Sequence, residues 1–403
     1  MSKRFSMKTI LPASITPEIF LRDYWQKKPL LIRQGLPQII GQFEPADIIE
    51  LAQNEDATAR LVKQFSDDDW RLSRSPLHEK DFKNLPEKWS VLVQNMEQWS
   101  LELGNLWQAF DFIPQWARDD IMVSYAPKGG SVGKHYDEYD VFLVQGYGER
   151  HWQLGKWCDP TTEFKPNQPI RIFDDMGELV IDETMQPGDV LYIPSRMAHY
   201  GVAKSDCLTF SFGLRLTNPA ALLDANAQML NHDNGDNRSV LQIPVRFTPP
   251  AQPCGELTPE TLSELKRQFL QTLSESAAFD DIFQQAVAKE LSSRRYDLLP
   301  TEEMADIEEI ETQLMHTNAR LRQDNNAKII YCENPLRIYA NGEWLDELTT
   351  EEAQLLKRLA NGESFNYKEL LNLWHNPTDK EAIWLILDSI CNWLDDGLIY
   401  IED

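Results

Sequence analysis

The chain has 403 residues, a formal net charge of −25 at pH 7 and 42% hydrophobic residues. That composition excludes a disordered chain, and the length is sufficient for two or three domains that each bury a core. The acidic balance argues against binding to nucleic acid or to anionic membranes, and it favours basic partners.

The sequence also bears on the compartment. The first residues contain no apolar run that suits a signal peptide, and no stretch approaches the ~20 apolar residues of a membrane-spanning helix. The five cysteines are scattered and form no Cys-x-x-Cys pair, which argues against a disulfide framework or a zinc ribbon. We therefore expect a cytoplasmic protein that does not contact a membrane.

Residues 1–115 are predicted to form a mostly helical region that supports the core. Thr16-Pro17-Glu18 indicates a helix start, with a capping hydroxyl, a proline at the first helical position and an acid at the positive end of the helix dipole. The stretch KKPLLIRQG that follows this helix predicts a short strand. EPADIIELAQ and WSVLVQNMEQWSLEL are predicted as further helices.

Residues 116–216 have a different pattern, with short β-branched or aromatic segments between Gly, Pro and Asp turns. The predicted strands are DIMVSYAP, DVFLVQ, RHWQLG, IRIFD, ELVIDETM, DVLYIP and CLTFSFGLRL. Short strands at this spacing are typical of an antiparallel sandwich or barrel. The run MQPGDVLYIPSRMAHYG predicts a turn, a strand, and then a loop that delivers His199.

Residues 217–316 return to helical patterns, with a polar, proline-bearing interruption at 231–256. The amphipathic region 257–294 predicts a homodimer, although packing against the sandwich is equally natural. Residues 317–403 are predicted to resemble a winged helix. The stretch 331–403 contains 15 acidic and 5 basic residues, so we expect no direct DNA binding and favour a structural or protein-docking role.

A candidate metal site begins at His135 and Asp137. Side chains two residues apart in a strand point to the same face, so this pair supplies two adjacent ligands. His199 is the best candidate for the third. Two histidines and one carboxylate leave three positions of a metal open, which suits the non-haem Fe(II) oxygenases.

Arg150 is a candidate anchor for the distal carboxylate of 2-oxoglutarate. We expect it to share a strand face with Trp152 and Leu154, where an arginine needs an anionic partner. Its planar fork suits a carboxylate. Ser124, on the preceding strand, is predicted to add a hydroxyl, and Thr209 and Ser211 are weaker candidates. The alternative for Arg150 is an ordinary surface salt bridge.

Three stretches taken together resemble the bacterial JmjC-type ribosomal oxygenases: HYDEYDVFLVQGYGERHW, MQPGDVLYIPSRMAHYG and FLRDYWQKKPLLIRQG. The resemblance spans nearly the whole chain. It implies an α+β fold with a double-stranded β-helix core of the cupin or jelly-roll type at 116–216. A helical N-terminal region, a helical dimerisation segment and a winged-helix-like C-terminal domain would surround this core.

The resemblance also implies a site and an activity. It places the Fe(II) ligands at His135, Asp137 and His199, and the 2-oxoglutarate contacts at Arg150 and Ser124. The implied reaction consumes O2 and hydroxylates an arginine of large-subunit ribosomal protein L-sixteen, a basic partner that suits the acidic chain. Two alternatives stay open: a cupin metalloenzyme acting on a small metabolite, and a non-catalytic metal-binding scaffold. The long helical flanks favour a macromolecular substrate.

Overall fold

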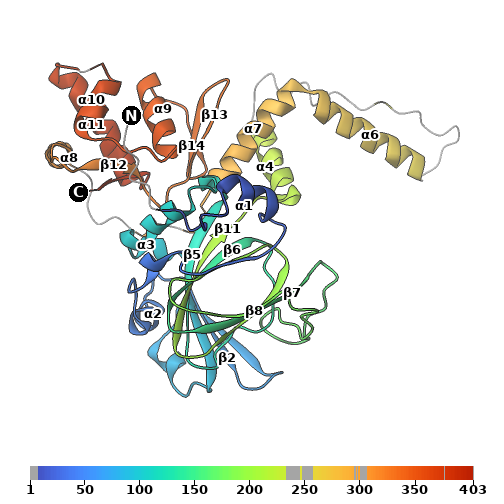
Figure 1. Cartoon of the computed structure of the whole chain (residues 1–403). Helices are drawn as coiled ribbons and strands as arrows, with labels where there is room; N and C mark the ends of the chain where they lie inside the picture. Colours follow the sequence, from blue (N-terminus) through green and yellow to red (C-terminus); the bar gives the residue numbers. More distant parts are fainter. Residues whose placement is uncertain are drawn as a thin grey trace.

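The computed structural model describes residues 8–232, 246, 257–294, 296, 298–299, 306–375 and 377–402. A β-sandwich occupies one end of the molecule, and the helix-rich C-terminal part lies at the other (Figure 1). Within the described residues, no helix has the length and apolar character needed to cross a bilayer. The predicted interruption at 231–256 falls largely outside the described residues.

Two antiparallel sheets form the core. The larger has the strand order β1-β9-β6-β11-β5-β4-β2-β3, and the smaller has the order β10-β7-β8. The strands are β1 Leu30–Ile32, β2 Ala59–Gln64, β3 Trp70–Arg74, β4 Lys88–Val93, β5 Arg118–Ala126, β6 Asp140–Tyr147, β7 Arg150–Trp157, β8 Ile181–Met185, β9 Val190–Ile193, β10 Met197–Ala203 and β11 Cys207–Leu214. This is the predicted α+β fold with a double-stranded β-helix core.

The expectation of a mostly helical region at 1–115 is wrong. The helices α1 (Pro17–Asp23) and α2 (Pro45–Leu51) are present where predicted, as is strand β1. However, β2, β3 and β4 extend the larger sheet, and WSVLV within the predicted third helix is strand β4. This strand is nearly continuously buried between β2 and β5, and such an apolar run has no periodicity that separates strand from helix.

Two expectations for the central strands also need correction. IRIFD at 170–174 forms no strand. His199 does not lie on a loop, because Met197–Ala203 pairs with β7 as strand β10, with a register irregularity between Met197 and His199. The predicted domain limits at residues 115, 216 and 316 stay predictions.

The larger sheet buries its outer face against the N-terminal helices and turns. Phe110 stacks on Phe212 of β11 with ring centroids 4.7 Å apart, and Phe20 of α1 meets Tyr192 of β9 edge-on at 5.0 Å. All four side chains are essentially fully buried. Because side chains alternate along a strand, the opposite face of the same sheet is free to line a cavity between the two sheets.

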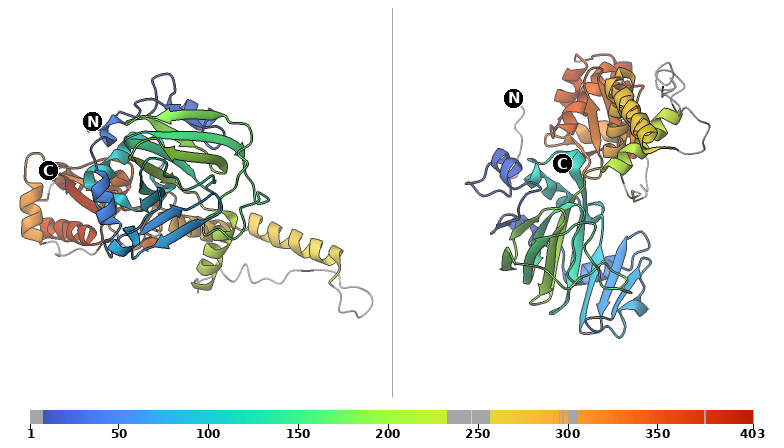
Figure 2. Two further views of the ribbon diagram at one scale, coloured as in Figure 1. Left: turned by 90° about the horizontal axis from the view of Figure 1, so that it is seen from below. Right: turned by 90° about the vertical axis from the view of Figure 1, so that its right-hand side faces the viewer.

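The C-terminal part has two groups of elements along the chain. The first helices are α4 (Pro219–His232), α6 (Pro259–Glu275), α7 (Ala277–Ser292) and α8 (Ile307–Leu314). The winged-helix domain follows, with α9 Thr350–Ala360, α10 Tyr367–Leu373, α11 Lys380–Asp395, the pair β12 Arg320–Gln323 and β16 Ile399–Glu402, and the sheet of β13 Ile329–Cys332, β14 Arg337–Ala340 and β15 Glu343–Leu345. Helix α7 packs on α4 and on this sheet, whereas α6 projects away from the body (Figure 2).

A buried carboxyl group ties the two parts together. Glu97 lies in the short 3-10 helix Met96–Gln98 and is 4% exposed. It accepts hydrogen bonds from the Ile121 N–H of β5 at 2.8 Å and from the Tyr296 hydroxyl at 2.9 Å. Burial, and then the nearby Asp120 carboxylate, raise the pKa of Glu97 to about 8.

This raised pKa predicts a pH-dependent gain from Glu97→Gln. Between the ordinary pKa of 4.5 and the folded pKa of about 8, the folded state binds more protons than the unfolded state, so wild-type stability falls as pH rises. Glutamine carries no charge and keeps one oxygen acceptor, and its NH2 group takes the place of the O–H of the protonated acid. We expect the variant to be more stable by on the order of 1–3 kcal/mol at about pH 9, and by little at about pH 5.

Urea unfolding at the two pH values measures this difference. Glu87→Gln, at an exposed carboxylate, is the matched control and should change neither midpoint. An equal effect of Glu97→Gln at both pH values would contradict the assignment.

Candidate active site

Backbone hydrogen bonds bring the two candidate histidine ligands together from segments 64 residues apart. The His135 N–H donates to the His199 carbonyl at 3.1 Å, and the His199 N–H donates to the His135 carbonyl at 2.8 Å. The sequence prediction that His135 and Asp137 lie within a strand is wrong, because both lie in the connection between β5 and β6. The Asp137 carbonyl accepts a hydrogen bond from the Arg196 N–H at 2.7 Å, which holds this connection beside β10.

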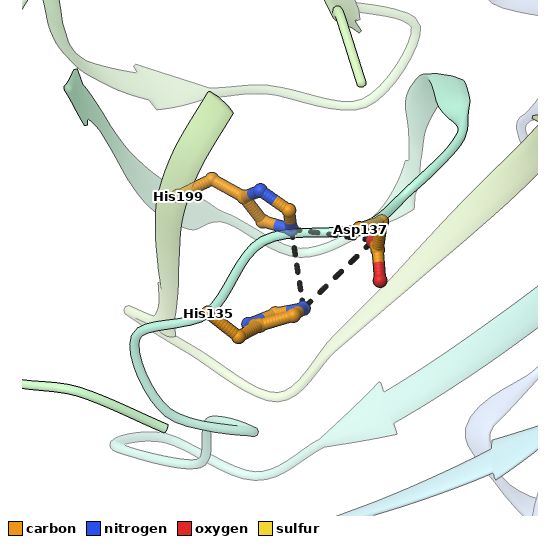
Figure 3. Close-up of side chains that lie close together, drawn as sticks. All are labelled: His135, Asp137 and His199. Carbon is orange, nitrogen blue, oxygen red and sulfur yellow. Dashed lines mark hydrogen bonds and ion pairs between the residues drawn. The ribbon is translucent and has the colours of Figure 1, made fainter. Parts of the chain in front are cut away.

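The three side chains point to one spot (Figure 3). The Nε2 atoms of His135 and His199 are 3.1 Å apart. Oδ2 of Asp137 lies 3.5 Å from Nε2 of His199 and 4.0 Å from Nε2 of His135. All the ligand atoms lie within 4.8 Å of one another, which is the spacing of donors around a single metal ion.

The other ring nitrogen of each histidine fixes its orientation. Nδ1 of His135 is 3.0 Å from the Gly133 carbonyl, and Nδ1 of His199 is 2.9 Å from the Met197 carbonyl. A carbonyl can only accept, so each Nδ1 carries the hydrogen and each Nε2 lone pair faces the shared spot. Burial, and then the neighbouring His135, lower the pKa of His199 to about 4, so its imidazole is neutral at pH 7 and able to bind a metal.

Arg150 of β7 is a buried guanidinium, 3% exposed. Its Nη1 donates to the Ser124 hydroxyl at 2.9 Å and to the Thr209 hydroxyl at 3.2 Å, and its buried Nε has no hydrogen-bond partner. No carboxylate among the described residues forms an ion pair with it, so the alternative of a surface salt bridge is wrong. Burial lowers the pKa of this guanidinium. A buried cation in this state calls for an anionic ligand.

The sequence pattern missed one member of this polar group. Gln145 of β6 is fully buried and accepts a hydrogen bond from the Thr209 hydroxyl at 3.0 Å. Its amide donates to the Tyr147 carbonyl at 2.8 Å, so it fixes the hydroxyl that receives Arg150. A polar residue two positions after the apolar Leu143 was the available signal. Ser211 lines the same cavity without contacting Arg150.

A cavity of about 1020 Å³ contains both groups, with the three metal donors, Arg150 and Ser124 in its wall. A hollow of about 1080 Å³ beside α8 contains none of them. The donor set of two imidazoles and a carboxylate fits Fe(II), and the unpaired Arg150 fits a dicarboxylate cosubstrate. A double-stranded β-helix with this site defines a JmjC-type protein.

Comparison with known proteins agrees with the assignment to the JmjC-type proteins. Residues 105–222 match the JmjC domain family, and residues 268–398 match the ROXA-like winged helix family. The chain is 64% identical to a probable ribosomal oxygenase of Haemophilus influenzae, with both chains covered completely. It is 30% identical to the ribosomal protein uL16 3-hydroxylase of Escherichia coli, over 81% of this chain and 84% of that one. The chain therefore belongs to the ribosomal oxygenase family.

A solved structure supports the same fold. The Escherichia coli ribosomal oxygenase YcfD, in complex with cobalt and 2-oxoglutarate, matches with a TM-score of 0.74 and 26% sequence identity. The match covers 97% of this chain and 99% of that chain. The fold and the winged-helix domain are thus shared over the full length.

Proposed function

We propose that the protein is an Fe(II)- and 2-oxoglutarate-dependent hydroxylase that modifies an arginine side chain of ribosomal protein uL16. The observation that carries the proposal is one cavity holding a three-donor metal site and a buried guanidinium without an anionic partner. The family, and the activity for which the Escherichia coli relative is named, support the choice of substrate. We place the enzyme in the cytoplasm, where its substrate is made.

Each residue has a defined task in this proposal. His135, Asp137 and His199 hold the metal on one face and leave positions open for other ligands. Arg150, fixed by Ser124 and Thr209, orients the distal carboxylate of the cosubstrate. Bound iron, with 2-oxoglutarate and O2, supplies the oxidising power that adds oxygen to an unactivated carbon. The apolar walls exclude water and position the substrate carbon.

The other partners follow from exposed surfaces. Helix α6 has no buried residue, and Leu262, Phe269 and Leu270 on one helical stripe are 48%, 53% and 52% exposed. This stripe supports the homodimer expected from the sequence. The acidic stretch 331–403 supports a docking or structural role for the winged-helix domain, without direct contact to DNA.

Mass spectrometry of ribosomal proteins tests the proposal. Purified enzyme, Fe(II), 2-oxoglutarate and total ribosomal proteins from cells lacking the enzyme are expected to give uL16 with one added oxygen atom on one arginine. Succinate release should match the oxygen gained, and chelation of the metal should stop both. If no ribosomal protein gains oxygen and no succinate forms above the background without substrate, the proposal fails.

A further inference from the structure

One cross-strand row of side chains runs along the cavity side of the larger sheet. The strand register joins it in the order Arg74, Arg60, Leu92, Ser124, Thr209 and Gln145. Side chains in one row point to the same face. Arg60 of β2 and Arg74 of β3 therefore face the same cavity as the metal donors, and both line it.

These two arginines oppose one another directly across β2 and β3. Like charges in that arrangement destabilise a sheet, so their presence needs another cause. Nη2 of Arg60 reaches only Sδ of Met122 at 3.3 Å, and its buried Nε has no hydrogen-bond partner. Within the described part of the chain, neither Arg60 nor Arg74 has a carboxylate within ion-pair distance.

Composition does not explain the missing partners, because the chain has 64 acidic and 39 basic residues. Two other arginines that line the cavity are paired: Arg215 with Asp119 at 3.1 Å, and Arg196 with Glu138 at 2.8 Å. Arg60 is close enough to Asp120 to lower the pKa of that carboxyl group, against the raising effect of burial, but the two side chains do not form an ion pair.

The cross-strand row of residues also shows how far the Arg60–Arg74 pair lies from Arg150, which anchors the cosubstrate. Ser124, which holds Arg150, lies two strands from Arg60, about 10 Å at the usual strand spacing. An anion on the arginine pair is therefore separate from 2-oxoglutarate. Since an extended peptide advances about 3.3 Å per residue, the pair is within reach of a side chain a few residues from the reacting one.

We propose that Arg60 and Arg74 form a subsite for an acidic side chain, Asp or Glu, of the protein substrate, close in sequence to the oxidised residue. The inference rests on the proposed function and adds how the enzyme selects which residue of the substrate peptide lies at the metal. The pair fits a peptide carboxylate better than an RNA phosphate, because the chain as a whole is strongly negative and the subsite adjoins the apolar Val62, Leu72 and Leu92.

The test is a binding measurement that does not depend on turnover. A fluorescent uL16 peptide spanning the oxidised residue is titrated by anisotropy, together with peptides in which each Asp or Glu is replaced in turn by its amide. Wild type is expected to bind one amide peptide about ten- to hundredfold more weakly than the parent peptide, because that peptide has lost a charge-assisted contact. The double variant Arg60→Gln/Arg74→Gln should bind the parent peptide as weakly as wild type binds that amide peptide. It should no longer distinguish the parent peptide from the amide peptide.

Arg71→Gln is the matched control. Arg71 lies on the same strand as Arg74 but on the other face, where it pairs with Asp69 at 3.1 Å. It should behave as wild type. Because the double variant keeps the metal donors and Arg150, it should also bind 2-oxoglutarate as wild type does and show the peptide defect in KM with little change in kcat.

Unchanged peptide affinity in the double variant would overturn the inference, and so would equal binding of all peptides by wild type. Arg60- and Arg74-dependent binding of a single-stranded oligonucleotide would overturn it in favour of a phosphate ligand. These results leave hydroxylation by wild type intact. In contrast, a wild-type enzyme that hydroxylates no ribosomal protein overturns the proposed function and the subsite with it.

Discussion

Replacing His199 with alanine is expected to lower hydroxylation by more than about 100-fold, since even removing a group that only orients a metal ligand costs 10–100-fold. His199 contributes one of three donors, and no other described histidine or acid lies in the cluster to replace it. His135→Ala should have the same effect. Steady-state hydroxylation, measured by mass spectrometry at saturating Fe(II) and 2-oxoglutarate, gives the loss.

A second readout separates metal loss from misfolding. Wild type should show a rise in melting temperature on adding Fe(II) without oxygen, because a ligand that binds only the folded state stabilises it. His199→Ala should show no such rise. His151→Ala on the adjacent strand is the control: its Nε2 contacts Asp182 at 2.7 Å, outside the metal cluster. Retained metal-dependent stabilisation in His199→Ala would refute the ligand assignment.

Replacing Arg150 with methionine is expected to raise the KM for 2-oxoglutarate by about 100-fold or more, because a buried ionic contact to the cosubstrate is lost. The same change should leave the cosubstrate-free protein as stable as wild type or more stable. In that state the guanidinium is a buried charge without an anionic partner, and an apolar side chain of similar length removes its cost.

Kinetics at varied 2-oxoglutarate and urea unfolding without it measure the two effects. Ser124→Ala provides a graded comparison, since it removes only one hydroxyl contact to Arg150 and should raise the KM by about tenfold or less. A wild-type KM in Arg150→Met, or a large loss of stability without cosubstrate, would show that the guanidinium is structural.

The site was more predictable from the sequence than the fold around it. The His-x-Asp pair, the distant His199 and an interior Arg150 follow from residue types and a family resemblance, whereas the strand alternation expected for His135 and Asp137 does not apply, because neither lies in a strand. The positions of β2, β3 and β4 did not follow, because a short buried apolar run such as WSVLV has no distinguishing period.

The pairing register between strands far apart in the sequence could not be predicted from the sequence either. Arg60 and Arg74 line the cavity, and Gln145 contacts Thr209 in its wall, only because of which residue lies opposite which across several strands. Nothing local in the chain encodes that pairing. The placement of His199 within β10 likewise depends on an irregularity in its pairing with β7, which the sequence does not reveal.

The hydrogen-bonded bridge between His135 and His199 has a consequence for the life of the enzyme. Two main-chain bonds already hold the metal-binding segments side by side, and backbone atoms make them without help from an ion. Iron therefore binds to a preformed site and does not have to bring the ligand-bearing segments together. We therefore expect loss of the ion to lower the melting temperature without unfolding the chain, so that protein emptied by iron starvation can take up iron again when the supply returns.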